Sequence, residues 1–182
     1  MKINVAGIIN ESIVDGPGIR LTVFCQGCPH HCPGCQNPET WEFVEKTRVA
    51  PEQILEMVHR NPLVHGVTLS GGEPFSQPAE LAELAKLLRA EGYEVAAYTG
   101  YTFEQLMQGS AEQRLLLENI DVLVDGPFLI EERTLEARFR GSRNQRVLDV
   151  PQSLKEERAV WMTRENWVGE QAKYRTAQGR QI

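Results

Sequence analysis

The sequence has no cysteine outside residues 25–35, no apolar run that approaches a membrane span, and fewer basic than acidic residues. Clustered cysteines cannot staple distant segments, so the fold must rest on its core, and 182 residues at 41% hydrophobic content can form one. A span needs roughly 20 apolar residues, and phosphate binding normally needs a basic face, whereas the net charge here is -6. We therefore expect one domain over residues 1–182, ending in a loose polar tail at 169–182, with no membrane or nucleic-acid partner.

The first ten residues, "MKINVAGIIN", contain no apolar stretch of signal-peptide length. We therefore expect a cytoplasmic protein. In that reducing compartment, clustered cysteines bind metal or perform redox chemistry more often than they form disulfides.

Strand-like and helix-like segments alternate along the chain. The expected strands are 18–25, 65–70, 93–100 and 121–128, with further candidates at 144–150 and 158–163. The expected helices are 51–60, 77–92 and one or two within 102–120, with a weaker stretch at 129–140. This alternation predicts an α/β fold with a parallel sheet and right-handed crossovers, either a barrel or an open sheet. The units are too few for a closed eight-stranded barrel, so we expect a partial, open-sided (βα) barrel.

Unusual residues follow each of the first four expected strands. A cysteine-rich loop follows 18–25, "GGEP" follows 65–70, "TGY" follows the third strand, and "DGPF" closes the fourth. Because the carboxyl ends of parallel strands lie at one edge, these motifs should share a rim, where ligands of such folds bind.

The cysteine spacing has three interpretations. Cys25, Cys28, Cys32 and Cys35 form two CxxC pairs, as in zinc sites, but only three residues separate the pairs. A ferredoxin run has a different spacing. The interpretation that we favour uses Cys28, Cys32 and Cys35 as ligands of a [4Fe-4S] cluster and leaves one iron open to a small molecule. Cys25 is then a packed small hydrophobe.

The cysteine motif together with "SGGEPF" (70–75) resembles the radical S-adenosylmethionine superfamily. Further stretches resemble its family of activators of anaerobic ribonucleoside-triphosphate reductase: "DGPGIR" (15–20), "CQNPETW" (35–41), "YTGYTFEQL" (98–106), "DVLVDGPF" (121–128) and "RFRGSRNQRV" (138–147). The resemblance implies a partial βα barrel whose open iron chelates S-adenosylmethionine. It also implies that cleavage of this cofactor yields a 5'-deoxyadenosyl radical, which removes hydrogen from a glycine of the reductase. A low-potential, flavodoxin-like electron donor is implied as well.

The resemblance also suggests roles for individual residues. It assigns the cofactor's amino group to Gly71, Gly72 and Glu73, which otherwise form a strand-to-helix turn with a capping Glu. Other rim residues could meet the ribose, adenine or a cation, or serve only as turn residues; these are Thr99, Gly100 and Asp125. Backbone contacts to the cofactor are expected from Gly34, Cys35 and Gln36, and Asp15 is expected to help receive the glycine-bearing loop.

Several residues have plainer expectations. His30 and His31 should be solvent-facing loop residues, and Trp41 and Trp161 should pack. Five arginines in an acidic chain should form a solvated face, with docking to the reductase or holding the cofactor carboxylate as the alternative; these are Arg133, Arg138, Arg140, Arg143 and Arg146. Two alternative functions stay open, namely an activase of pyruvate formate-lyase and a noncatalytic zinc or iron-sulfur binding module.

Overall fold

All strands of the computed structural model, which describes residues 1–169, belong to one seven-stranded sheet of order β3-β1-β2-β4-β5-β6-β7. The strands are β1 (Ile3–Ser12), β2 (Ile19–Cys25), β3 (Thr47–Val49), β4 (Val64–Gly71), β5 (Glu94–Tyr98), β6 (Val122–Asp125) and β7 (Arg146–Asp149). Neighbours among β2, β4, β5 and β6 pair in parallel, whereas β1, β3 and β7 pair antiparallel. The fold is therefore a mixed α/β sheet that does not close. Residues 170–182, most of the expected tail, lie outside the described residues.

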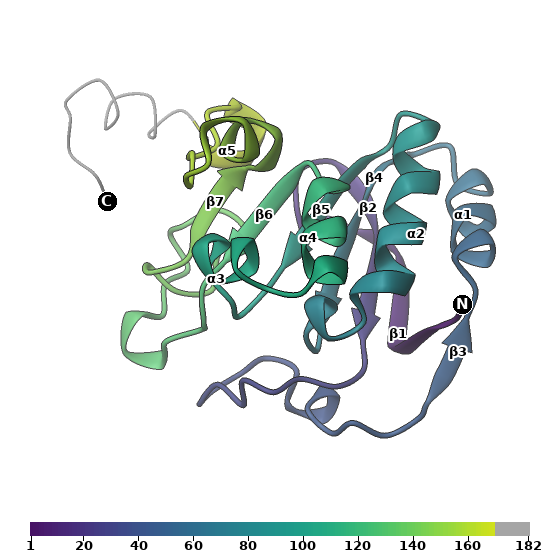
Figure 1. The fold of residues 1–182 in the computed structure, drawn as a ribbon, viewed down its shortest axis with the longest axis horizontal. Coiled ribbons are helices and arrows are strands. Elements are labelled where there is room, and N and C mark those ends of the chain that lie inside the picture. Colours follow the sequence, from purple (N-terminus) through teal and green to yellow (C-terminus); the bar gives the residue numbers. More distant parts are fainter. Residues whose placement is uncertain (170–182) are drawn as a thin grey trace.

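Three helices cover one face of this sheet, where α1, α2 and α4 lie beside one another (Figure 1). The helices are α1 (Pro51–His59), α2 (Pro78–Ala90), α3 (Phe103–Met107), α4 (Ala111–Glu118), α5 (Val150–Glu156) and α6 (Glu165–Val168). Proline occupies the first position of α1 and α2, where its missing N–H costs nothing, and Thr102 and Ser110 cap α3 and α4. No helix in residues 1–169 combines the length and apolar composition that a membrane crossing requires.

The opposite face of the sheet, here called the inner face, is partly polar. Arg20 of β2, only 1% exposed, donates hydrogen bonds to Thr68 Oγ1 at 2.7 Å and to Glu94 Oε1 at 2.9 Å. Trp167 of α6 packs over this face, and its indole Nε1 donates to the same Glu94 oxygen at 3.1 Å. A buried charge is tolerable only when it is paired. Here the buried Arg20 guanidinium is paired with the Glu94 carboxylate, which also accepts the hydrogen bond from Trp167.

The sheet differs from the sequence-based prediction at its margins. Strands β1 and β3 were not expected, and β7 runs antiparallel. The pattern of β1 is obscured because register shifts flank Gly7 and Ile9, which breaks the alternation of buried residues.

Two predicted elements are wrong. The stretch 129–140 forms only a 3-10 turn, Ile130–Glu132, and Leu135 in it is 90% exposed, so no apolar stripe holds a helix. The stretch 158–163, between α5 and α6, makes only a single bridge, between Trp161 and Leu148.

Candidate functional site

The cysteine loop, residues 26–37, leaves the end of β2 and folds back on itself. Cys25 is the last residue of β2 and is fully buried, whereas Cys28, Cys32 and Cys35 lie half-buried in the loop. The amide of Cys35 donates to the carbonyl of Cys32 at 3.0 Å, and the amide of Cys28 donates to the carbonyl of Trp41 at 2.9 Å. The three expected ligands thus share one compact loop, and the fourth cysteine lies in the core.

The electrostatics of the metal-free loop favour the protonated form of Cys28 and Cys32. Burial raises the pKa of Cys28 and of Cys32, while backbone N–H groups, including that of Phe128 for Cys32, act in the opposite direction. The charge of Cys32 raises the pKa of Cys28, and that of Cys35 raises the pKa of Cys32, so the sulfurs interact with one another. Bound iron reverses this preference for the protonated form, because coordinating thiols are deprotonated.

The loop has no closed metal site. Within residues 1–169, no three His, Cys, Asp or Glu side chains are gathered closely enough to hold a metal ion. The donor chemistry of three neighbouring half-buried thiols nevertheless fits a [4Fe-4S] cluster.

The carboxylate of Glu73, 1% exposed, joins the turn after β4 to the turn after β5 and to the cysteine loop. Its Oε1 accepts hydrogen bonds from the Phe75 amide and from Thr99 Oγ1, both at 2.9 Å. Its Oε2 accepts from the Gly100 amide at 2.9 Å and lies 2.8 Å from Nε2 of His30. The predicted meeting of the rim motifs is therefore confirmed for the cysteine loop, "GGEP" and "TGY".

Glycines permit this close approach. A Cβ on Gly71, which has φ +89°, would lie 2.6 Å from Phe24 Cα, and one on Gly72 would lie 2.4 Å from the carbonyl oxygen of Gly27. The amide of Glu73 donates to that same oxygen at 2.8 Å. On the far side of the loop, a Cβ on Gly34 would lie 2.7 Å from the side chain of Ile130. The loop is therefore enclosed between the "GGEP" turn and residues 128–130. Gln36 is exposed beside it.

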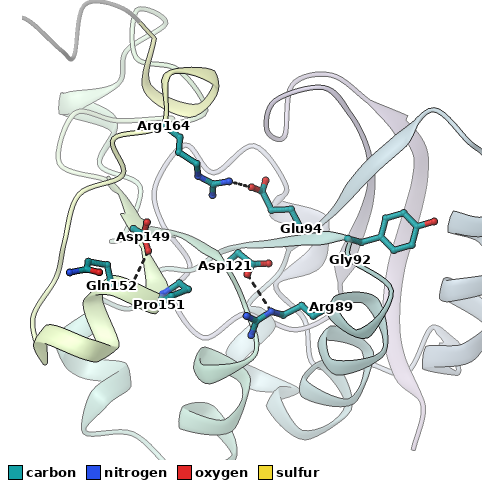
Figure 2. Close-up of a pocket in the computed structure, with 9 residues that line it drawn as sticks. Arg89, Gly92, Glu94, Asp121, Asp149, Pro151, Gln152 and Arg164 are labelled. Carbon is teal, nitrogen blue, oxygen red and sulfur yellow. Dashed lines mark hydrogen bonds and ion pairs between the residues drawn. The ribbon is translucent and has the colours of Figure 1, made fainter.

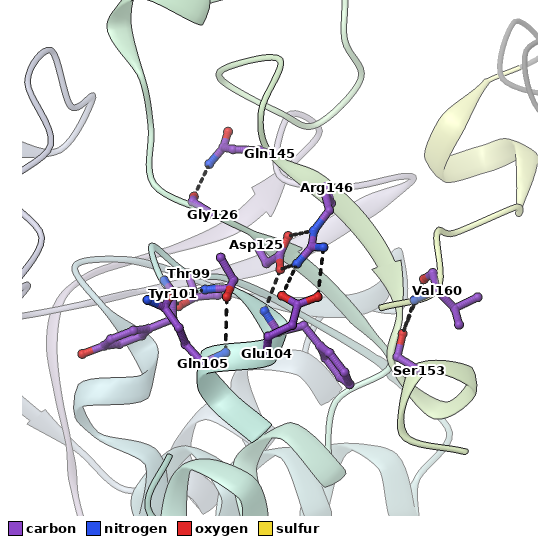
Figure 3. A network of polar contacts seen from close by, with 12 residues as sticks. Thr99, Tyr101, Glu104, Gln105, Asp125, Gly126, Gln145, Arg146, Ser153 and Val160 are labelled. Atoms are coloured by element: carbon purple, nitrogen blue, oxygen red, sulfur yellow. Dashed lines mark hydrogen bonds and ion pairs between the residues drawn. The ribbon is translucent and has the colours of Figure 1, made fainter. Parts of the chain in front are cut away.

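Asp125 lies at the end of β6, and its carboxylate faces the Arg146 guanidinium and the start of α3 (Figure 3). Its Oδ2 accepts from the Phe103 amide at 2.7 Å, and both oxygens pair with the Arg146 guanidinium. Arg146 also pairs with Glu104, and this hydrogen bond lowers the pKa of Glu104. The hydrogen bonds to Asp125, followed by those to Glu104, raise the pKa of Arg146. Asp125 thus caps α3 and neutralises Arg146, and its oxygens are occupied within the chain.

Asp15 lies over the inner face. Its Oδ2 accepts hydrogen bonds from Ser12 Oγ at 2.6 Å and from Thr22 Oγ1 at 3.0 Å, and its carbonyl accepts from Thr68 Oγ1 at 2.8 Å. These partners belong to β1, β2 and β4, so Asp15 is fixed on the sheet rather than in the cysteine loop.

Two expectations for charged residues are wrong. His30 is not a solvent-facing filler, because it contacts Glu73 and its ring meets the Tyr101 ring edge-on at 4.5 Å. Arg146 is not on a solvated face, because it pairs with the buried Asp125, directly opposite it in the β6–β7 register. Arg140 is half-buried over the ring of Trp161. The pairing of Arg146 with Asp125 could have been predicted, because Arg146 begins a strand beside the strand that Asp125 ends. No local sequence feature predicted the contact of His30 with Glu73.

A hollow lies at the start of β5, away from the cysteine loop (Figure 2). It encloses about 640 Å³ next to the start of β5 and the end of β7. Its charged groups are satisfied, since Arg89 pairs with Asp121 and Arg164 pairs with Glu94.

Sequence comparisons with known proteins identify the family. A family model described as "4Fe-4S single cluster domain" matches residues 14–148. The anaerobic ribonucleoside-triphosphate reductase-activating protein of Escherichia coli K12 is 37% identical over 144 residues, which cover 74% of this chain and 91% of that protein. Its namesake in Vibrio cholerae is 37% identical over 73% of this chain and 89% of that protein, and the one in Enterobacteria phage T4 is 32% identical over 74% and 86%. The solved structure of QueE from Escherichia coli overlaps 56% of this chain and 52% of its own, with 25% identity and a TM-score of 0.44.

Proposed function

The chain belongs to the family of anaerobic ribonucleoside-triphosphate reductase-activating proteins, with a 4Fe-4S single cluster domain, and from this premise we propose that it is the iron-sulfur activase that generates a glycyl radical on that reductase. The observation that carries the proposal is the cysteine loop itself, which holds three half-buried thiols and is hydrogen-bonded to the "GGEP" turn through Gly27 and His30. The alternative of a noncatalytic zinc module accounts for the thiols but not for that turn.

In this proposal Cys28, Cys32 and Cys35 each hold one iron, and the fourth iron stays open for S-adenosylmethionine. The cluster, when bound, would pass an electron from an external donor to S-adenosylmethionine, which would split into methionine and a 5'-deoxyadenosyl radical. This radical would take a hydrogen atom from the reductase glycine and become 5'-deoxyadenosine. The chain's own part is to hold the three half-buried thiols close to the rim.

The remaining site residues have different tasks. We assign recognition of the cofactor to the backbone of Gly71 to Glu73, of Thr99 and of Gly34 to Gln36. The Glu73 carboxylate already accepts four hydrogen bonds, about as many as it has lone-pair sites. We therefore assign the ammonium group of S-adenosylmethionine to backbone carbonyl oxygens of this turn rather than to the carboxylate. Asp15 supports the inner face, and in this proposal it also helps to receive the glycine-bearing loop there.

The fold and partners complete the proposal. We propose that the sheet is the partial barrel of the radical S-adenosylmethionine type and that the whole chain acts as one domain. An unclosed sheet leaves a side through which a polypeptide loop can enter, as a protein substrate requires. Reduction of the cluster calls for a low-potential, flavodoxin-like donor.

The test is a reconstitution under anaerobic conditions with iron and sulfide, followed by addition of reductant, S-adenosylmethionine and the reductase. We expect cofactor cleavage and an organic-radical resonance signal whose splitting collapses when the reductase contains α-deuterated glycine. A signal that arises with pyruvate formate-lyase instead would transfer the activity to that partner. Colourless protein with bound zinc and no iron would refute the enzyme assignment altogether.

A further inference from the structure

The imidazole of His30 lies in a socket built by three segments of the rim. Nε2 of His30 is 2.8 Å from Oε2 of Glu73, the residue that follows the two glycines after β4. The His30 ring meets the Tyr101 ring edge-on, with centroids 4.5 Å apart and planes at 75°. The side chain of His30 is only 17% exposed, although it belongs to a loop whose other histidine, His31, is exposed.

Gly100 shows that this fit is close. A Cβ at Gly100 would lie 2.4 Å from Cδ2 of His30, a distance that real Cβ atoms essentially never show. The amide of Gly100 donates to the same Glu73 oxygen that His30 contacts, and Thr99 Oγ1 donates to the other. The "TGY" motif therefore has a structural role within the chain. Thr99 and Gly100 orient the Glu73 carboxylate, Gly100 leaves room for the His30 imidazole, and Tyr101 packs against the His30 ring.

The position of His30 in the sequence gives this contact its meaning. His30 lies between Cys28 and Cys32, and the amides of His30 and His31 face the Cys28 sulfur. A carboxylate only accepts hydrogen bonds, so Nε2 of His30 must carry the hydrogen, which fixes the orientation of the ring. Held in this way, the ring ties the loop segment between two thiols to the ends of β4 and β5.

We propose that His30 is a positioning residue that docks the cysteine loop on Glu73 and thereby fixes the three thiols relative to the cofactor-binding turn. The inference rests on the proposed function for its consequence, the geometry of the cluster, but the docking itself is a property of the metal-free chain. His31 provides the matched control, because it is the adjacent histidine of the same loop and contacts Trp41 instead, with ring centroids 5.0 Å apart.

The first measurement uses the metal-free protein and the rate at which each cysteine is alkylated by iodoacetamide, read by mass spectrometry. Loss of a charge-assisted hydrogen bond should free the loop, so His30→Ala is expected to react about tenfold faster at Cys28 and Cys32 than the wild type. His30→Gln, which keeps an N–H donor, should restore most of the protection, and His31→Ala should match the wild type. Equal acceleration at the buried Cys25 would mean general unfolding and would overturn the inference.

The second measurement uses the anaerobically reconstituted protein. We expect His30→Ala to bind S-adenosylmethionine about tenfold more weakly and to give a heterogeneous resonance spectrum of the reduced cluster, with His30→Gln closer to the wild type. If His30→Ala equals His31→Ala in alkylation, affinity and spectrum, the docking role is wrong while the proposed function stands. If the wild type itself takes up no cluster, the proposed function and the role toward the cofactor fail together, and the alkylation rates still decide whether His30 docks the loop.

Discussion

The amide of Gly72 donates a hydrogen bond to the carbonyl of Cys25 across 2.8 Å, which ties the turn after β4 to the point where β2 becomes the cysteine loop. Cys25 and Gly72 are 47 residues apart in the sequence, and this hydrogen bond fixes their relative position at the rim. The position of the thiols thus depends on backbone as well as on side chains.

A methyl group at Gly72 should disturb this junction. Its Cβ would lie 2.4 Å from the Gly27 carbonyl oxygen and 2.9 Å from that of Cys25, so we expect Gly72→Ala to lower the free energy of unfolding by about 2 kcal/mol. Gly7→Ala is the matched control, because a Cβ there meets nothing within 4 Å. Denaturant unfolding of both variants decides the matter, and equal stabilities would show that the turn yields without strain.

Replacement of each cysteine by alanine should separate ligands from packing. We expect Cys28→Ala, Cys32→Ala and Cys35→Ala each to lose the reconstituted cluster, measured as iron and sulfide per chain. Cys25→Ala should keep it, at a cost of about 1 kcal/mol for the small cavity in the core. Loss of the cluster in Cys25→Ala as complete as in the other three would make the three-ligand assignment untenable.

The pH dependence of the metal-free, reduced protein should report the burial of Cys25. Burial, followed by the charge of Glu73, raises the pKa of the Cys25 thiol. The unfolded chain ionises this thiol near pH 8.5 while the folded chain keeps it neutral, so stability is complete below about pH 8.5 and declines as the pH rises. The loss of unfolding free energy due to Cys25 approaches about 1.4 kcal/mol for each pH unit above about pH 8.5.

Cys25→Ala lacks this contribution. Its free energy of unfolding should therefore fall less steeply than that of the wild type between pH 8.5 and 10. Parallel curves for the two proteins over this range would contradict the burial of the thiol.

The pair formed by Arg146 and Asp125 should matter more for stability than for the cofactor. Arg146→Ala leaves the buried carboxylate of Asp125 without its cation, which should cost about 3 kcal/mol. Glu104→Ala removes the exposed partner of the same guanidinium and should cost less than about 1 kcal/mol. Urea unfolding measures both changes.

The same pair bears on the expected role of Asp125. Since its oxygens are occupied by Arg146 and the Phe103 amide, Asp125→Asn should leave the affinity for S-adenosylmethionine within about twofold in protein that remains folded. A much larger loss of affinity at unchanged stability would restore Asp125 to the cofactor site.

The sequence alone predicted the position of those parts of the site that depend on the direction of the strands. Apolar runs followed by "GGEP" and "TGY" marked the ends of two parallel strands, and polarity alone then placed both motifs beside the cysteine loop. The same rule could not tell which way a side chain turns. Asp125 ends β6 as expected, yet its carboxylate faces Arg146, which arrives from an antiparallel strand.

Contacts between distant segments were beyond local patterns. The role of His30 depends on Glu73, 43 residues away, and a histidine in a polar loop carries no periodicity that would reveal it. Strand β1 was hidden for a different reason, because its register shifts interrupt the alternation by which half-buried strands are found.

The hydrogen bond from Trp167 to Glu94 also constrains when the protein can finish folding. Arg20 leaves a ribosome early, its carboxylate partner follows 74 residues later, and the indole that shares this carboxylate follows another 73 residues after that. Contacts of such long sequence separation form late, because the closure of long loops must precede them. A nascent chain that lacks α6 therefore has the Arg20 guanidinium on a sheet face that Trp167 does not yet cover, so this part of the core is completed only after α6 has been synthesised.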